Sequence, residues 1–144
     1  MSGPALHQRQ LGAPLWRIAW WYLLHLLCFA WFVPVYRYRA WGINRIPRTG
    51  PLLFVSNHQS FFDPIVVGLA GHRRQFWSLA RSTLFNYGVF SWLIRSLNAI
   101  PVVQGAGDLP AIRTCIDVLA RGHALLVFPE GARTLDGTTG RFQT

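Results

Sequence analysis

The sequence contains no lysine, and acidic residues are almost as scarce. Its 144 residues include fourteen arginines but only five aspartates and glutamates, which gives a formal net charge of +9. Such a balance suits two kinds of partner, nucleic acid or an anionic membrane surface. The arginines are scattered, and no zinc-finger spacing or aromatic-basic RNA signature accompanies them. We therefore expect membrane lipids as a partner and no nucleic acid.

Patterns for metals, disulfides and common cofactors are also missing. Cys28 and Cys115 lie far apart, one in an apolar run and one in a helical pattern, so we predict buried free thiols in a reducing compartment. The five histidines show no paired spacing, which predicts no metal site. The sequence has no Gly-x-Ser-x-Gly elbow and no Walker loop, and residues 105–107 lack the third glycine of a dinucleotide turn. We expect no bound cofactor.

Hydrophobic residues, by contrast, make up 51% of the chain, and aromatic residues make up 15%. The densest apolar run lies between Arg17 and Pro34, where His25 is the only polar residue. At about 1.5 Å per residue this run extends roughly 24 Å, which is short for a hydrocarbon core of about 30 Å. Three interpretations remain open: a spanning helix, an interfacial helix lying in one leaflet, or an apolar helix packed on the core.

Arginines flank this run unequally, with more of them on its C-terminal side. By the positive-inside rule, the downstream domain would face the cytoplasm if the helix spans. We therefore expect a location at the cytoplasmic face of the cell membrane. We divide the chain into a tail with a membrane helix (1–35) and a globular domain (36–144).

Strand-like and helix-like segments alternate after residue 51. The apolar runs predict strands, and the capped periodic segments predict helices; the strands are 52–56, 75–79, 99–103 and 124–128, and the helices are 64–70, 82–97 and 108–121. The strands are apolar throughout, which is typical of parallel strands covered on both faces. We predict an α/β fold with a mostly parallel sheet covered by helices, preceded by the N-terminal membrane-associated helix.

Residues 57–63 (NHQSFFD) form a polar cluster directly after the first predicted strand. His58 and Asp63 can lie side by side at the sheet edge, where a carboxylate would fix the imidazole tautomer and make the other nitrogen a general base. The alternative is structural. Asp63 precedes Pro64 and an apolar stretch, so it can simply be a helix N-cap.

A second polar segment, residues 128–134 (FPEGART), follows the last predicted strand. Gly131 allows a close backbone approach, and the guanidinium of Arg133 suits a phosphate. The alternative is a turn with a solvent-facing arginine. In a parallel sheet both polar segments would lie beyond the carboxyl ends of strands, where sites usually form.

Taken together, residues 57–63 and 128–134 resemble the first and third blocks of the glycerolipid acyltransferase family, which includes 1-acylglycerol-3-phosphate acyltransferases. The resemblance covers about residue 36 to the end. It implies that His58 and Asp63 are the catalytic pair. It also implies that Glu130, Gly131 and Arg133 bind the glycerol phosphate part of the substrate.

The chain departs from the family pattern in two places. Gln104 stands where the family's second block, aligned with residues 98–104, ends in a substrate-binding arginine. The chain also stops at residue 144, where the family continues with further strands, helices and a fourth block. We therefore expect a C-terminally truncated domain.

The resemblance implies an O-acyltransferase of phospholipid biosynthesis. It would move a fatty acyl group from acyl-CoA or acyl-carrier protein, as co-substrate, to the hydroxyl of a lysophospholipid, converting 1-acylglycerol 3-phosphate to phosphatidic acid. One alternative is an acyltransferase for another lysolipid, such as lyso-ornithine lipid. Two others are a serine hydrolase that uses Ser56 or Ser60, and a non-catalytic membrane-binding fragment.

Overall fold

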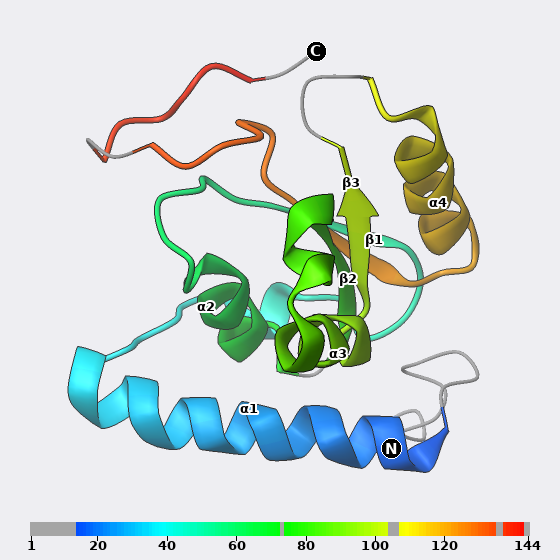
Figure 1. The fold of residues 1–144 in the computed structure, drawn as a ribbon. Coiled ribbons are helices and arrows are strands. Elements are labelled where there is room, and N and C mark those ends of the chain that lie inside the picture. Colours follow the sequence, from blue (N-terminus) through cyan, green and yellow to red (C-terminus); the bar gives the residue numbers. More distant parts are fainter. Residues whose placement is uncertain (1–13, 73, 104–106, 135–136, 143–144) are drawn as a thin grey trace.

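The computed structural model describes residues 14–72, 74–103, 107–134 and 137–142. Helices and strands alternate after the first helix, as Figure 1 shows. The elements are α1 (Leu15–Tyr36), η2 (Ile43–Arg45), β1 (Leu52–Val55), α2 (Asp63–Ala70), β2 (Phe76–Arg81), η3 (Ser82–Asn86), α3 (Gly88–Ser96), β3 (Ala99–Val102), α4 (Leu109–Ala120) and β4 (Ala124–Val127).

The four strands form one parallel sheet in the order β1-β4-β2-β3. The first and last strands of the chain are therefore neighbours, with Leu53 opposite Leu125 and Val55 opposite Val127. Parallel neighbours end at the same edge of a sheet. The predicted α/β class with a parallel sheet is confirmed.

Strand β4 lies inside the sheet and is covered on both faces. Ala124 and Leu126 pack in a cluster with Trp21 of α1 and Phe76 of β2. Leu125 points to the other face and packs with Ile100 of β3 and Val118 of α4. Helices α1, α2 and α3 thus lie on one side of the sheet and α4 on the other (Figure 1).

Double coverage does not extend to β1, which is an edge strand. Its side chains alternate between half-buried and exposed, and the exposed ones are Leu53 and Val55. Phe54 points the other way and packs against the cluster around Phe76. The expectation that every strand is buried on both faces is wrong for β1, because α4 packs on β3 and β4 instead.

The first helix lies along the domain as a long bar beneath α2 and α3 (Figure 1). Its inner side buries Ile18, Trp21 and Phe32. Arg17 donates a hydrogen bond to Asn98 Oδ1 at 2.7 Å, and Trp20 Nε1 donates to Ser96 Oγ at 2.9 Å. By length and composition, α1 is the one helix among the described residues that could cross a membrane.

The outer side of α1 is apolar and exposed along its whole length. The exposed large hydrophobic residues of the helix are Leu15, Trp16, Leu23, Leu26, Leu27, Phe29, Trp31, Val35 and Tyr36. A helix with one side packed on its domain and an apolar opposite side has the form of an interfacial helix. The packed inner side agrees with the interpretation of an apolar helix on the core, and the exposed outer side agrees with that of an interfacial helix.

The predicted helix 82–97 is two elements. Residues 82–86 form a 3-10 turn, and α3 begins only at Gly88. Tyr87 between them is extended, with φ −96° and ψ 92°, and the flanking Asn86 and Gly88 are poor helix formers. Ser82 is the first residue of this turn, whose N-cap is Arg81, and no side-chain hydrogen bond caps it. Both cysteines are free thiols as predicted, although they are half-buried instead of fully buried.

An arginine, Arg74, is almost fully buried near the amino ends of the strands, with 2% of its surface exposed. Its guanidinium donates to three backbone carbonyls, those of Pro47 at 3.1 Å, Gly50 at 2.7 Å and Gly122 at 3.3 Å. Gly50 precedes β1 and Gly122 precedes β4. Arg74 therefore ties the starts of these two neighbouring strands together, at the end of the sheet opposite the predicted site.

Candidate active site

Two loops meet at the carboxyl edge of the sheet because β1 and β4 are adjacent. The Ser56 amide donates to the carbonyl of Val127 at 3.3 Å, which extends the pairing by one residue. Beyond it, the Thr134 amide donates to the carbonyl of His58 at 2.9 Å. The segment after β4 runs beside the segment after β1 at the top of Figure 1. The two predicted motifs are thus in direct contact.

The imidazole of His58 is paired with the carboxylate of Asp63. Nδ1 of the ring lies 2.9 Å from Asp63 Oδ2, and both side chains are about one-fifth exposed. The same oxygen accepts hydrogen bonds from the amides of Gln59 at 2.7 Å and Ser60 at 2.8 Å. The structure confirms the predicted proximity of this pair.

The position of Asp63 in α2 excludes the capping alternative. Helix α2 begins at Asp63 itself, its N-cap is Phe62, and no side chain caps it. The carboxylate is turned back onto the preceding turn, which it holds through the two amides. Pro64 follows at the start of the helix, where its missing N–H costs nothing.

Hydrogen bonding also fixes the charge of Asp63. Burial alone would raise the pKa of its carboxyl group, but the Ser60 amide, the His58 ring and the Gln59 amide together outweigh burial and lower the pKa. The group is therefore ionised at neutral pH and can only accept hydrogen bonds. It follows that Nδ1 of His58 carries the hydrogen, which leaves Nε2 as the basic nitrogen.

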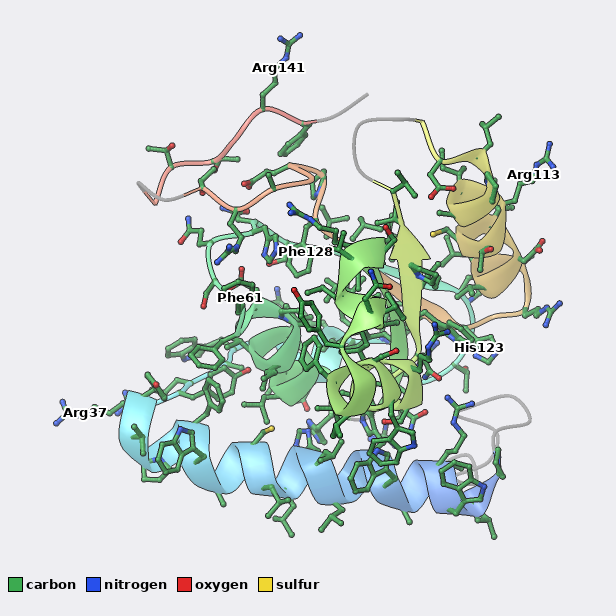
Figure 2. All side chains as sticks on the ribbon, viewed as in Figure 1. Arg37, Phe61, Arg113, His123, Phe128 and Arg141 are labelled. Atoms are coloured by element: carbon green, nitrogen blue, oxygen red, sulfur yellow. The ribbon has the colours of Figure 1, made fainter. Side chains whose placement is uncertain are left out.

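The ring of Phe128 covers one face of this imidazole. The ring centroids of His58 and Phe128 are 4.3 Å apart, with an angle of 22° between the planes. In Figure 2 the labelled Phe128 and Phe61 lie near each other and apart from His123, which precedes β4. The stacked ring restricts the rotation of the imidazole. The sequence identified Phe128 only as the first residue of the second motif and predicted no role for it.

Neither nearby serine is arranged as a nucleophile. Ser60 Oγ accepts a hydrogen bond from the Phe62 amide at 3.1 Å, and Ser56 Oγ donates to the carbonyl of Asn57 at 3.2 Å. A serine nucleophile would need to donate to His58. This geometry gives no support to the serine hydrolase alternative.

The second motif also contains Glu130, which is buried, with 4% of its surface exposed. Neither carboxylate oxygen has a hydrogen-bond partner among the described residues. The hydroxyl of Thr134 is likewise buried and unpaired within the described part of the chain. A Cβ on Gly140 would lie 3.1 Å from Glu130 Oε2, so this glycine permits the close packing. Gly131 has φ +65°, a left-handed conformation that favours glycine.

Arg133 is exposed on the rim of the site, and its guanidinium carbon lies 3.6 Å from the centroid of the Phe61 ring. The His58–Asp63 pair is the one side-chain ion pair among the residues that the structure describes. The guanidinium therefore has no carboxylate within ion-pair distance in that part of the chain. The guanidinium is therefore available to bind an anionic ligand.

Two further expectations concern residues away from this centre. Gln104 lies outside the described residues, so its predicted contact stays a prediction; it follows β3, which β2 separates from β4. No group of three or more potential metal ligands occurs among the described residues.

At the carboxyl edge of this parallel α/β sheet lie an oriented histidine and an arginine without a carboxylate partner among the described residues, an arrangement typical of an enzyme site. The acyltransferase family profile matches residues 37–144. The chain belongs to the acyltransferase family.

Individual relatives agree with this assignment. The chain is 26% identical over 113 residues to the chloroplast 1-acyl-sn-glycerol-3-phosphate acyltransferase of Arabidopsis thaliana, which covers 76% of this chain and 31% of the relative. It is 32% identical over 85 residues to the lyso-ornithine lipid O-acyltransferase of Pseudomonas aeruginosa, which covers 58% of this chain and 32% of the relative.

A solved structure is similar over nearly the whole chain. It is the crystal structure of the 1-acyl-sn-glycerophosphate acyltransferase PlsC from Thermotoga maritima, with a TM-score of 0.69 and 25% identity. The match covers 96% of this chain and 56% of PlsC. The chain thus spans about a third of the length of these curated relatives and about half of the solved structure.

Proposed function

We propose that the chain is the catalytic part of an O-acyltransferase that transfers a fatty acyl group from a thioester to the hydroxyl of a lysophospholipid. The observation that carries this proposal is the His58–Asp63 pair, which leaves Nε2 as the basic nitrogen, while the hydroxyls of Ser56 and Ser60 are hydrogen-bonded to backbone groups. The names of the relatives give the acceptor class, and the unpaired Arg133 beside the pair supports an anionic head group.

The reaction needs one base and one acid, and His58 supplies both in turn. Nε2 removes the proton of the acceptor hydroxyl as its oxygen attacks the thioester carbonyl, and Asp63 stabilises the imidazolium that forms. When the tetrahedral intermediate collapses, the C–S bond breaks and the leaving thiolate takes the proton from Nε2. General base catalysis of this kind contributes about 10²–10⁴-fold to the rate.

The acceptor is held by the loop after β4. Arg133 binds the phosphate of 1-acylglycerol 3-phosphate, and Gly131 lets the backbone approach it. Glu130 is suited to accept a hydrogen bond from a glycerol hydroxyl, because its buried carboxylate lacks a partner among the described residues. Gln104 would supply a neutral contact where a second arginine is expected.

The acyl donor is acyl-CoA or acyl-carrier protein, and no further cofactor takes part in these steps. The thioester already carries the activated acyl group, so the protein has only to move protons and hold the two substrates. The names of the relatives give the acceptor and not the donor. The assay described below distinguishes the two donors.

The protein works at the membrane surface with α1 lying in the plane of the interface. The exposed apolar side of α1 supports this placement, since its inner side is already packed on the domain. Trp16 and Trp31, exposed near the two ends of the helix, are suited to the headgroup region. The excess of arginine favours the anionic cytoplasmic leaflet.

A second acceptor class has support from one relative, the enzyme named lyso-ornithine lipid O-acyltransferase. Such an acceptor has a different head group from a phosphate monoester. The chemistry at His58 would be the same, but Arg133 would have no phosphate monoester to bind.

An acceptor and donor panel tests the proposal. Membranes that contain the protein would be assayed with lysophosphatidate, lysophosphatidylethanolamine and lyso-ornithine lipid, each with acyl-CoA and with acyl-carrier protein. We expect transfer to lysophosphatidate at the highest kcat/KM. Transfer to none of the three acceptors would contradict the proposal, and a preference for lyso-ornithine lipid would select the second class.

A further inference from the structure

The mechanism above gives no role to Phe61, an aromatic ring in the middle of the first motif. Its side chain is 72% exposed, although the ring is large and apolar. The next residue, Phe62, instead packs on the N-terminal helix, where it contacts Phe32 and Tyr36. Neighbouring phenylalanines therefore face different surroundings, and only Phe61 faces the loop after β4.

The contact of Phe61 is with the guanidinium of Arg133, at 3.6 Å from the ring centroid. This distance is well inside the range of about 6 Å for a cation–π interaction. A ring against one face of the guanidinium leaves the N–H groups at its edge available, and those groups form the fork that binds a phosphate in two places.

Hydrogen bonds hold the backbone on both sides of this contact. On the Phe61 side, Asp63 Oδ2 accepts from the amides of Gln59 and Ser60, and Ser60 Oγ accepts from the Phe62 amide. On the Arg133 side, the amide of Thr134 donates to the His58 carbonyl. The side chain of Arg133 would otherwise have four rotatable bonds and no neighbouring carboxylate in the described part of the chain to orient it.

We propose that Phe61 is a positioning residue that holds the Arg133 guanidinium beside His58, in the place where the phosphate of the acceptor binds. Phe61 thereby contributes to selection for a phosphate monoester without touching the reacting atoms. The proposal rests on the proposed function, because it assigns Arg133 to the acceptor. It places one specificity element of the site within the same turn that carries the catalytic pair.

Kinetics with lysophosphatidate separate this role from a structural one. Loss of an exposed cation–π contact corresponds to about a two- to fivefold change in an equilibrium constant. We expect Phe61→Leu to raise the acceptor KM by about this factor, with kcat and the donor KM unchanged. Phe61→Tyr keeps an aromatic face and should behave as the wild type.

The double variant tests whether Phe61 acts through Arg133. In an Arg133→Ala background, Phe61→Leu should produce no further increase in the acceptor KM. A further increase equal to that in the wild type would overturn the proposal and indicate an independent role, such as contact of the ring with lipid. Phe90→Leu is the matched control, because it removes an exposed ring from α3. It should leave the ratio of the acceptor KM to the donor KM unchanged.

A binding measurement keeps the proposal testable without turnover. The full chain with His58→Ala would be titrated calorimetrically with 1-hexanoylglycerol 3-phosphate, a short soluble acceptor. Adding Phe61→Leu should raise Kd about two- to fivefold, and an unchanged Kd would overturn the positioning role. If the wild type transfers no acyl group but this Kd still depends on Phe61, the proposed reaction fails while the positioning role stands.

Discussion

At the scale of single residues, one oxygen of Asp63 has two roles. Oδ2 orients His58 and also holds the turn formed by Gln59 and Ser60. A carboxylate that only capped a helix would stabilise the fold without affecting turnover. The observed contacts instead link stability and chemistry through the same atom.

Asp63→Asn should therefore lower both turnover and stability. The amide has no negative charge to favour the hydrogen on Nδ1, so we expect kcat to fall at least about 100-fold, within the range for general base catalysis. Hydrogen bonds to a charged group contribute about 1.5–3 kcal/mol each, and the partial exposure of Asp63 reduces this, so unfolding should become easier by about 1–3 kcal/mol. Steady-state kinetics and urea titration measure the two effects.

Asp108→Asn is the matched control for that variant. Asp108 also accepts two backbone amides, those of Val103 and Ala111, but it caps α4 and does not touch His58. Asparagine is a good N-cap, so stability should change little and kcat should stay at the wild-type value. Equal losses of turnover in the two variants would contradict a specific role of Asp63.

The stability of the protein should depend on pH through Asp63. Hydrogen bonding holds the pKa of the folded carboxyl group below its ordinary value, despite the opposing effect of burial. The unfolded chain thus binds a proton at a higher pH than the folded one, and stability is lost as pH falls below about 4 toward the folded pKa. Over this range the stability difference between wild type and Asp63→Asn should shrink; parallel curves of unfolding free energy against pH would contradict the assignment.

Some of the site was predictable from single residues and some was not. The pairing of His58 with Asp63 follows from local sequence, because a strand end, a turn and a helix start place them within five positions. The contacts of Phe61 with Arg133 and of His58 with Phe128 join residues about 70 positions apart. They depend on which strands are neighbours, and periodicity does not contain that information. The arginine in the core, Arg74, is another case, since its partners are backbone carbonyls with no sequence signature.

At the scale of elements, α1 carries the proposed membrane contact. Its inner side belongs to the core through Ile18 and Trp21, and its outer side is exposed and apolar. Deleting the helix would disturb both sides at once. Substitutions on one side separate the effect on the core from the effect on membrane binding.

A double variant with Leu23→Gln and Leu27→Gln should bind membranes more weakly and keep its fold. Both side chains are exposed one turn apart, and burying a leucine in an apolar environment contributes about 1.5–3 kcal/mol. Their loss should reduce the partition into anionic vesicles at least about 100-fold. Vesicle sedimentation and thermal melting would measure partition and stability.

Ile18→Gln provides the opposite control, because Ile18 is buried on the inner side of the same helix. It should lower the melting temperature. Sedimentation of the Leu23→Gln, Leu27→Gln protein with vesicles as completely as the wild type would contradict the interfacial placement.

The elements themselves were largely predictable, because capping residues and apolar runs are local signals. The four strands and the helices α2 and α4 lie close to their predicted ranges. The prediction was wrong at residues 82–97, where periodic apolar residues continue across the extended Tyr87. It was also wrong for the outer face of β1, because an apolar run does not reveal whether a helix covers it.

At the scale of the whole molecule, strand order creates the site. The chain makes β1 first and β4 last, yet they are neighbours, and so the two polar loops meet. The sequence indicated a parallel sheet with loops at its carboxyl edge, but it did not indicate this order. The crossover also explains why Arg74, at the other end of the sheet, ties the starts of the same two strands together.

The proposed reaction depends on His58 as the base that activates the acceptor hydroxyl. The most direct test is the rate of acyl transfer to lysophosphatidate by His58→Ala, compared with His123→Ala, which removes a half-buried imidazole at the opposite end of β4. Vesicle binding and melting temperature would be measured on the same preparations to show that both variants fold and bind membranes. We predict that His58→Ala loses at least about 99% of the wild-type kcat while His123→Ala retains it. If folded, membrane-bound His58→Ala kept more than a few per cent of the wild-type rate, the proposed mechanism would be wrong.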